Sequence, residues 1–335
     1  MMTLLALLLS AGAVAAQPAP TETVQPDPVR AEPAAPEPVR RPNAVNLHET
    51  YAMEGLTVPE NEIHTLLPRD AIPALTDPAL QPIAEADWMT PDDRVIEVVI
   101  NGEAVAAPLR ILNWHEVANM TVGGEPVAAT YCPLCDSATL ISRRHTLADG
   151  TERVLEFGVS GALYNSNVLM YDRTDMALWS QLGMRAVSGP HAGTSLEHLP
   201  ARIIPWGRFL LEHPEGAVIS VETGHERDYA NPEPYEWFFA DPDRLLVPVQ
   251  GMGDALPRKT LGVGVRTEGG AWFVPADAIG TGYTLTTDLG DVVLETTDAG
   301  IAVVRAPQGA HTAQAFYYSW SAFHPNAVIV GSDEE

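Results

Sequence analysis

Short apolar runs separated by turn residues dominate the chain and predict β-strands joined by tight turns. An apolar run over residues 95–100 leads into Asn101-Gly102, which favours a two-residue hairpin, and a second run follows over 104–107. Apolar residues then recur at helical spacing, which predicts a short helix over 108–118. The same alternation predicts further strands over residues 126–131, 138–142 and 154–157, the last after a hairpin turn at Asp149-Gly150.

This order of elements predicts a mostly β fold, of the α+β kind with short helices. Residues 262–305 echo the order of residues 95–145, with a hairpin, a short helical segment and a second Gly-containing hairpin. Recurring units of this kind predict two related β units in one compact body. The later unit lacks the cysteines of the earlier one, so the earlier unit is the expected carrier of any chemistry.

The chain is expected to divide into three parts. Residues 1–16 contain a short apolar run and small residues before an A-x-A-like site, which predicts a signal peptide. Residues 17–45 are rich in Pro, Ala and Glu and predict a disordered linker, and residues 46–335 form the β-rich domain. A periplasmic or secreted location follows, with no membrane insertion after the signal is cleaved.

The net charge of the chain limits the classes of partner that are expected. The chain has 44 acidic and 19 basic residues and a formal net charge of −25. Such a surface repels phosphate backbones, so no nucleic-acid partner is expected. The sequence has no phosphate-binding loop and no dinucleotide motif, so no nucleotide cofactor is expected either. A protein or small-molecule partner in the envelope stays unspecified.

The only two cysteines form Cys132-Pro133-Leu134-Cys135 between two predicted strands. Thioredoxin-type motifs place C-x-x-C at a helix N-terminus, whereas a turn between strands resembles the metal-binding knuckle of rubredoxins and zinc ribbons. The favoured interpretation is a copper or zinc site with Cys132, Cys135 and His115 as ligands. Met170 and His191 are further candidates to complete the set.

Two alternatives stay open for the same motif. One is a thiol–disulfide redox protein, in which Cys132 attacks and Cys135 resolves. The other is a non-catalytic binding module with a structural disulfide, which stabilises so short a loop by only about 2 kcal/mol. His115 also begins a His-Glu-x-x-Asn run, but Asn119 is a poor zinc ligand and argues against a zincin protease. Whether the protein is an enzyme is left undecided.

Polar and aromatic residues near the motif are candidates to line a pocket. The same residue types also form ordinary strand pairs and Asp–Arg bridges, which is the more common outcome. The candidates are Trp114, Glu116, Tyr164, Asn165, Met170, Asp172, Arg173, Trp179 and Gln181.

Several motifs in order resemble the DUF3179 family of bacterial proteins over roughly residues 70–330. They are Ile111-Leu-Asn-Trp-His-Glu116, Tyr131-Cys-Pro-Leu-Cys135, Phe157-Gly-Val-Ser-Gly161, Leu163-Tyr-Asn-Ser166, Leu169-Met-Tyr-Asp-Arg173, Leu178-Trp-Ser-Gln181, Gly189-Pro190, Ala192-Gly-Thr194 and the aromatic end around Trp320. The family has no assigned function. The resemblance implies that Trp114-His115-Glu116 and the cysteines form a joint site. Asp136 departs from the pattern, because the family commonly has Gly there.

Overall fold

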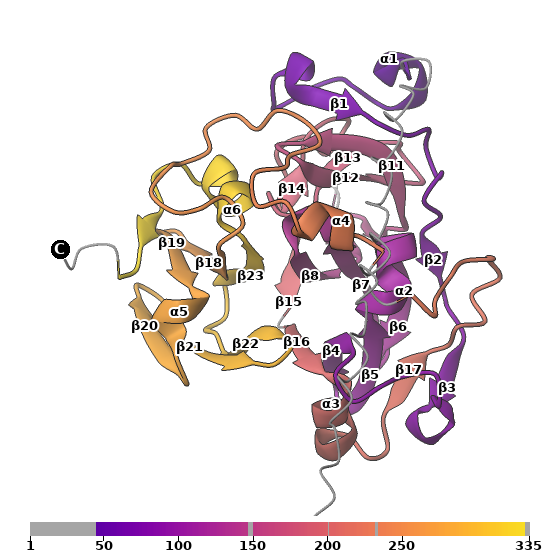
Figure 1. Cartoon of the computed structure of the whole chain (residues 1–335). Coiled ribbons are helices and arrows are strands. Elements are labelled where there is room, and N and C mark those ends of the chain that lie inside the picture. The colour runs from indigo at the N-terminus through magenta and orange to yellow at the C-terminus, as the bar shows by residue number, and fades with distance from the viewer. Residues whose placement is uncertain (1–44, 147–149, 200, 232–233, 332–335) are drawn as a thin grey trace, which may run out of the picture. The chain divides into compact units, whose positions relative to one another are not determined.

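The computed structural model describes residues 45–146, 150–199, 201–231 and 234–331 (Figure 1). Within these residues the chain is mostly β-strand with a few short helices, which confirms the predicted fold class. The predicted signal peptide lies outside the described residues, and so does the predicted linker except for Val45. No helix in this part of the chain is long and apolar enough to span a bilayer.

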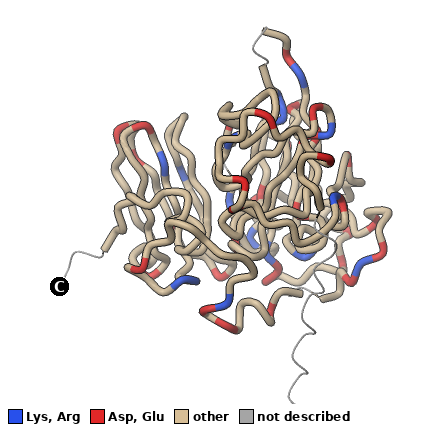
Figure 2. Tube along the Cα trace, turned by 90° about the horizontal axis from the view of Figure 1, so that it is seen from above, with Lys and Arg blue, Asp and Glu red and all other residues tan. Residues whose placement is uncertain are grey.

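Charged residues are spread over the described chain, with acidic positions on many of its loops (Figure 2). Most arginines lie beside carboxylates, as in the ion pair of Arg110 with Asp93, whose nearest atoms are 2.7 Å apart. Buried pairs of this kind fix side-chain geometry more than they add stability.

The first large sheet is built on the predicted hairpin. Strands β4 (Arg94–Ile100) and β5 (Glu103–Pro108) pair antiparallel. The turn residues Asn101 and Gly102 both have positive φ, 50° and 85°, which these two residue types adopt most readily. The sheet has the order β16-β4-β5-β17-β3, and its other strands are β16 (Arg202–Pro205), β17 (Ala217–Ile219) and β3 (Leu80–Pro82).

The helix after this hairpin is shorter than predicted. It is α2 (Leu109–His115), whereas the pattern predicted a helix as far as residue 118. Glu116 reverses the chain with a φ of 58°, and β6 (Val117–Val122) starts at the next residue. The prediction was wrong at this end because residues 117 and 118 pair with a neighbouring strand, which periodicity cannot reveal.

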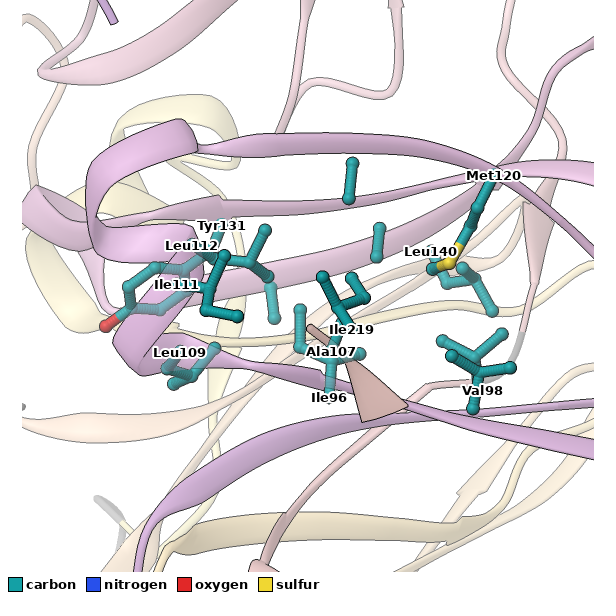
Figure 3. Packing of buried hydrophobic residues seen from close by; sticks show 14 of the residues in the cluster. Ile96, Val98, Ala107, Leu109, Ile111, Leu112, Met120, Tyr131, Leu140 and Ile219 are labelled. Atoms are coloured by element: carbon teal, nitrogen blue, oxygen red, sulfur yellow. The ribbon is translucent and has the colours of Figure 1, made fainter. Parts of the chain in front are cut away.

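The second large sheet faces the first across the main core. Its order is β15-β8-β7-β6-β2, and its other strands are β15 (His198–Leu199), β8 (Ser137–Ser142), β7 (Glu125–Cys132) and β2 (Leu75–Thr76). Figure 3 shows Ile96 and Val98 from β4 in one cluster with Met120, Tyr131 and Leu140 from the second sheet. Full burial of one such aliphatic side chain stabilises a fold by about 1.5–3 kcal/mol.

The third sheet has the order β1-β11-β12-β13-β14. Its strands are β1 (Ile63–Thr65), β11 (Phe157–Tyr164), β12 (Asn167–Asp172), β13 (Leu178–Ser180) and β14 (Arg185–Ala186). A separate two-stranded ribbon joins β9 (Arg144–Thr146) to β10 (Glu152–Val154), so the predicted strand 154–157 is split between two strands. Residue 149 of the predicted hairpin turn lies outside the described residues.

Two smaller sheets complete the C-terminal part. The first has the order β23-β18-β19-β24 and contains β23 (His311–Phe316), β18 (Leu261–Thr267), β19 (Gly270–Pro275) and β24 (Val328–Ile329). The second contains β20 (Tyr283–Thr287), β21 (Gly290–Thr297) and β22 (Gly300–Arg305). The remaining short elements are α1 (Leu47–Thr50), α4 (Glu236–Phe239), α5 (Ala276–Ile279), η1 (Glu60–Glu62) and η2 (Ile83–Glu85).

The sheet around β18 repeats the plan of the sheet around β4. In each, a hairpin is flanked by an antiparallel strand on one side and a parallel strand on the other. A seven-residue helix follows the flanking antiparallel strand in both, α3 (Trp206–Glu212) after β16 and α6 (Tyr317–Phe323) after β23. A histidine follows each helix as its C-cap, His213 and His324. Residues at corresponding positions of the two sheets can therefore be compared directly.

Candidate dithiol site

The two cysteines lie in the tight connection between β7 and β8. Cys132 is the last residue of β7, and Pro133–Cys135 form one 3₁₀ turn (η3) before β8 begins at Ser137. Cys132 lies opposite Ser137 in the ladder of these strands. The motif therefore occupies a turn between two strands, as predicted, and no long helix follows it.

Asp136 closes this turn in the left-handed conformation, with φ 44° and ψ 43°. Aspartate tolerates this region better than most residues, so it can replace the glycine expected there. Its carboxylate accepts a hydrogen bond of 2.7 Å from the Tyr131 hydroxyl and lies 2.9 Å from the Arg94 guanidinium. The Gln314 amide donates a third bond of 3.2 Å. These contacts hold the turn from three sides.

Both thiols are free, and their sulfur atoms are 3.3 Å apart. Cys132 is 1% exposed and Cys135 is 0% exposed. They belong to a buried apolar cluster that includes Phe157, Met170 and Trp179 of the third sheet. The two sulfurs therefore meet in a dry environment that strengthens electrostatic interactions between nearby groups.

The polar groups around the two sulfurs favour a thiolate at Cys135. Burial alone opposes this charge, but hydrogen bonds lower the pKa of Cys135 below its ordinary value. The donors to its Sγ are the Cys132 thiol at 3.3 Å and the Asn167 amide at 3.5 Å. The Tyr318 hydroxyl donates to the Leu134 carbonyl at 2.6 Å and lies 3.8 Å from the sulfur, and the Ser166 carbonyl lies 3.3 Å from it.

Cys132 has the opposite tendency. Burial and its hydrogen bond to Cys135 raise the pKa of the Cys132 thiol well above its ordinary value, and the Glu116 carboxyl adds to the shift. The site therefore favours one thiol and one thiolate that share a proton, rather than two thiolates.

Glu116 brings a buried carboxyl to the same place. It caps α2, where its N–H donates to the Leu112 carbonyl and its own carbonyl accepts from Tyr131 N–H, both at 2.7 Å. Burial, and secondly the charge of Cys135, raise the Glu116 pKa from 4.5 to about 8. A carboxyl with such a pKa exchanges its proton near neutral pH.

A short segment that contains α4 covers the site. Phe238 belongs to the cluster that holds the cysteines, and Tyr235 and Phe239 pack against it. Burial raises the pKa of Tyr235, and so do the charges of Glu116 and Cys132. The Lys259 ammonium lies 3.6 Å from the Phe238 ring centroid and donates to the carbonyl of Phe238. These contacts fix the segment around α4 in its position against the cysteine cluster.

His115 points away from the predicted ligand set. Its Nδ1 lies 2.7 Å from the Pro73 carbonyl, and its Nε2 lies 2.5 Å from the Tyr229 hydroxyl. Burial lowers its pKa to about 4, so the ring is neutral with both nitrogens occupied. The structure therefore brings Cys132 and Cys135 together but does not add His115 to them.

Among the described residues, the one group of three or more His, Cys, Asp or Glu with ligand atoms mutually within 4.8 Å is Glu97, Glu212 and His213. Sequence reasoning missed this group because Glu97 lies more than 100 residues before the adjacent pair Glu212 and His213. Arg202 forms ion pairs with both carboxylates, and His213 Nε2 lies 2.7 Å from Glu97. The bound guanidinium makes it an ion-pair network rather than a vacant cation site.

The other predicted residues divide between this site and the scaffold. Gln181 is hydrogen-bonded to residues beside the cysteines. Its Oε1 accepts hydrogen bonds from Asn167 at 2.7 Å and from Ser137 at 3.0 Å. Met170 lies in the cysteine cluster. His191 instead lies 2.9 Å from Asp175, so it is not free to join the sulfurs.

The remaining candidates have structural partners elsewhere. Asp172 accepts a bond of 3.0 Å from the Trp179 indole, and Arg173 pairs with Asp70 at 3.1 Å. Tyr164 packs against Phe323, and Asn165 accepts from the Gln250 N–H at 2.9 Å. Trp114 has a buried indole N–H with no hydrogen bond inside the described ranges. Sequence reasoning did not identify Asn167, Tyr235 or Tyr318, since no local signal marks them.

Comparison with protein families agrees with the resemblance noted in the sequence. The family model described as "Protein of unknown function (DUF3179)" matches residues 69–312, which is most of the chain. The chain therefore belongs to the DUF3179 family. Neither the curated proteins nor the solved structures contain a match.

Proposed function

For this DUF3179 protein we propose an exported thiol–disulfide redox function centred on Cys132 and Cys135. The observation that carries the proposal is a pair of free sulfurs 3.3 Å apart, only one of which has a lowered pKa. Sulfurs at this separation need only a small movement to form a disulfide bond of about 2.05 Å. Export rests on the predicted signal peptide at residues 1–16.

Cys135 is proposed as the attacking thiol and Cys132 as the resolving thiol, the reverse of the order predicted from the sequence. The thiolate is the nucleophile in thiol–disulfide exchange, and hydrogen bonds favour it at Cys135. The raised pKa of Cys132 keeps that thiol protonated until the first step is complete.

The proposed oxidant is a low-molecular-weight disulfide, R–S–S–R′. The Cys135 thiolate attacks one of its sulfurs, the S–S bond breaks, and R′S⁻ leaves with the electron pair. Cys132 then loses its proton and attacks the Cys135 sulfur of the mixed disulfide, which releases RS⁻. The protein dithiol loses two electrons and R–S–S–R′ gains them. One proton for the released thiols comes from Cys132 and the other from Glu116 or water.

Access to the sulfurs requires movement of the cover. Both cysteines are at most 1% exposed, Phe238 belongs to the same buried cluster, and Tyr235 packs against that cluster. The proposed exchange therefore proceeds through a state in which the segment around α4 has lifted, and small disulfides should react faster than protein disulfides.

The test is a redox titration of the full chain in glutathione buffers, with acid quenching, alkylation in denaturant and mass spectrometry. Because the chain has 2 cysteines, every intramolecular disulfide is Cys132–Cys135. We expect one two-electron transition between the dithiol and the disulfide. Thiols that stay reduced in every buffer, or a disulfide with a potential below about −300 mV, would mark a structural pair and end the proposal.

The two single variants serve as matched controls for the order of attack. Cys132→Ser keeps the favoured thiolate and should accumulate a mixed disulfide with glutathione. Cys135→Ser keeps only the thiol of raised pKa and should react at least about ten times more slowly at pH 7. Equal rates would refute the assigned order.

Copper binding is the second candidate at the same pair. It is favoured by two free, buried sulfurs that converge without a disulfide, since thiolates are the ligands that Cu(I) prefers. Zinc fits less well, because a structural zinc site needs four ligands and no His, Asp or Glu of the described chain joins the sulfurs in a compact set. About one copper per natively exported chain, lost in the double-cysteine variant, would support this candidate over the redox function.

A further inference from the structure

Among the described arginines without an ion pair, two in the C-terminal half line the same cavity. They are Arg185 on β14 and Arg266 on β18, both partly exposed. Within the described ranges, neither guanidinium has an ion pair or a hydrogen bond to a carboxylate. In a chain with a net charge of −25, two neighbouring cations without acidic partners need an explanation.

Both arginines line a cavity of about 310 Å³. The cavity lies between the third sheet and α6, and its wall also includes Tyr164, Ser180, Phe323 and His324. A smaller cavity shares Gly183, Arg266 and His324 with it and adds His198 and His311. Pockets that bind small molecules typically begin at about 300 Å³ and combine apolar walls with a few polar groups.

The smaller cavity contains ring nitrogens that lack partners. Both ring nitrogens of His198, Nδ1 of His311 and Nε1 of Trp320 are buried without a hydrogen bond in the part of the chain that the structure describes. Burial lowers the pKa of His311, and the charges of Arg266 and Arg185 lower it further. The same causes lower the pKa of His324 to about 4. These neutral rings each offer an N–H donor, and a buried donor left unsatisfied is costly.

In the related sheet around β4, a carboxylate occupies the equivalent position and pairs with the histidine. There His213, the C-cap of α3, lies 2.7 Å from Glu97 of β4, and Arg202 of β16 pairs with the same carboxylate. In the second sheet His324 takes the place of His213, and Gly264 takes the place of Glu97, each being fourth in its strand. The carboxylate is thus missing from this sheet, while Arg266 adds positive charge beside the histidine.

We propose that the cavity of about 310 Å³ binds a small organic anion, with its phosphate or carboxylate group held by Arg185 and Arg266 and a further donor supplied by His324. Guanidinium groups bind both kinds of oxyanion through paired hydrogen bonds. The volume corresponds to roughly ten water molecules at about 30 Å³ each, which suits a compact metabolite-sized anion. Phe323 and Tyr164 provide the apolar wall for its uncharged part.

The test is isothermal titration calorimetry of the full chain with two probes, inorganic phosphate and succinate. We expect saturable binding of at least one of them, and the preferred probe identifies the anionic group. Arg185→Gln and Arg266→Gln should each weaken binding at least tenfold. Arg227→Gln is the matched control, because Arg227 is exposed and its guanidinium, among the described residues, hydrogen bonds only to the neighbouring Glu226 carbonyl, so binding should stay within twofold.

Two outcomes would overturn the proposal. One is no saturable binding of either probe to the unmodified protein at millimolar concentration. The other is binding that both pocket variants retain while their circular dichroism shows the native fold. Arg185→Lys and Arg266→Lys are the controls for a folding defect. They keep the positive charge but lose the paired hydrogen bonds of the guanidinium, so they should weaken binding less than the glutamine variants.

Discussion

Glu116→Gln is expected to make the protein more stable at alkaline pH and to change little at acid pH. Burial and Cys135 raise the carboxyl pKa from 4.5 to about 8 in the folded state. Between these values the folded protein keeps a proton that the unfolded chain has released. Stability from this group is therefore fully present below pH 4.5 and is lost as the pH rises through 8. Glutamine resembles the protonated acid at every pH.

The size of the effect follows from the pKa difference. Each unit corresponds to about 1.36 kcal/mol, so a change from 4.5 to about 8 corresponds to roughly 4–5 kcal/mol in total. Between pH 5 and pH 8, the free energy of unfolding of the variant should gain roughly 3 kcal/mol relative to the unmodified protein. That is a large fraction of the stability of a typical domain.

Urea denaturation of both proteins at pH 5, 6.5 and 8 under reducing conditions measures this difference directly. Glu215→Gln is the control, because Glu215 is exposed on the loop before β17 and should show the same difference from the unmodified protein at every pH. A Glu116→Gln difference that stays constant from pH 5 to pH 8 would refute the assignment of a buried, protonated carboxyl beside Cys135.

Three further substitutions test how the scaffold is held. Asn119→Ala should lower the free energy of unfolding by roughly 2–4 kcal/mol in urea, because the buried amide bonds to the backbone of Leu75 and to both backbone groups of Phe157. Gly264→Ala should lower the melting temperature by several degrees, since its methyl would lie 2.0 Å from the Trp320 indole. Asp136→Asn should destabilise less than Asp136→Ala in the same assay, because asparagine tolerates the left-handed backbone and keeps a hydrogen-bond acceptor.

Local signals account for the part of the fold that could be predicted. The Asn101-Gly102 turn and the apolar runs beside it gave the β4–β5 hairpin, because both depend on neighbouring residues. Sequence periodicity could not give the pairing of β16 with β4 or the parallel pairing of β17 with β5, which join segments more than 100 residues apart. The end of α2 was missed for the same reason, since strand pairing overrides helical spacing at residue 117.

The site was predictable only where its chemistry is local. The spacing of Cys132 and Cys135 indicated a joint site, and the structure brings the two sulfurs together. His115 was an attractive ligand on residue type alone, but the sequence could not show that Pro73 and Tyr229 occupy its ring nitrogens. Tyr318 lies 183 positions from Cys135, and only the fold brings its hydroxyl to the sulfur.

The proton on Glu116 and the charge on Cys135 depend on each other. The thiolate helps to raise the Glu116 pKa, so disulfide formation removes one of the two causes of that shift and leaves burial as the other. Oxidation of the two cysteines should therefore lower the Glu116 pKa. Glu116 then releases a proton, although neither thiol is left to ionise. By linkage, the midpoint potential of the pair must fall with pH across the range in which Glu116 titrates. In Glu116→Gln this contribution of the carboxyl to the pH dependence of the midpoint potential should disappear. The same pH dependence in both proteins would show that the cysteines are buried beside Glu116 without being coupled to it.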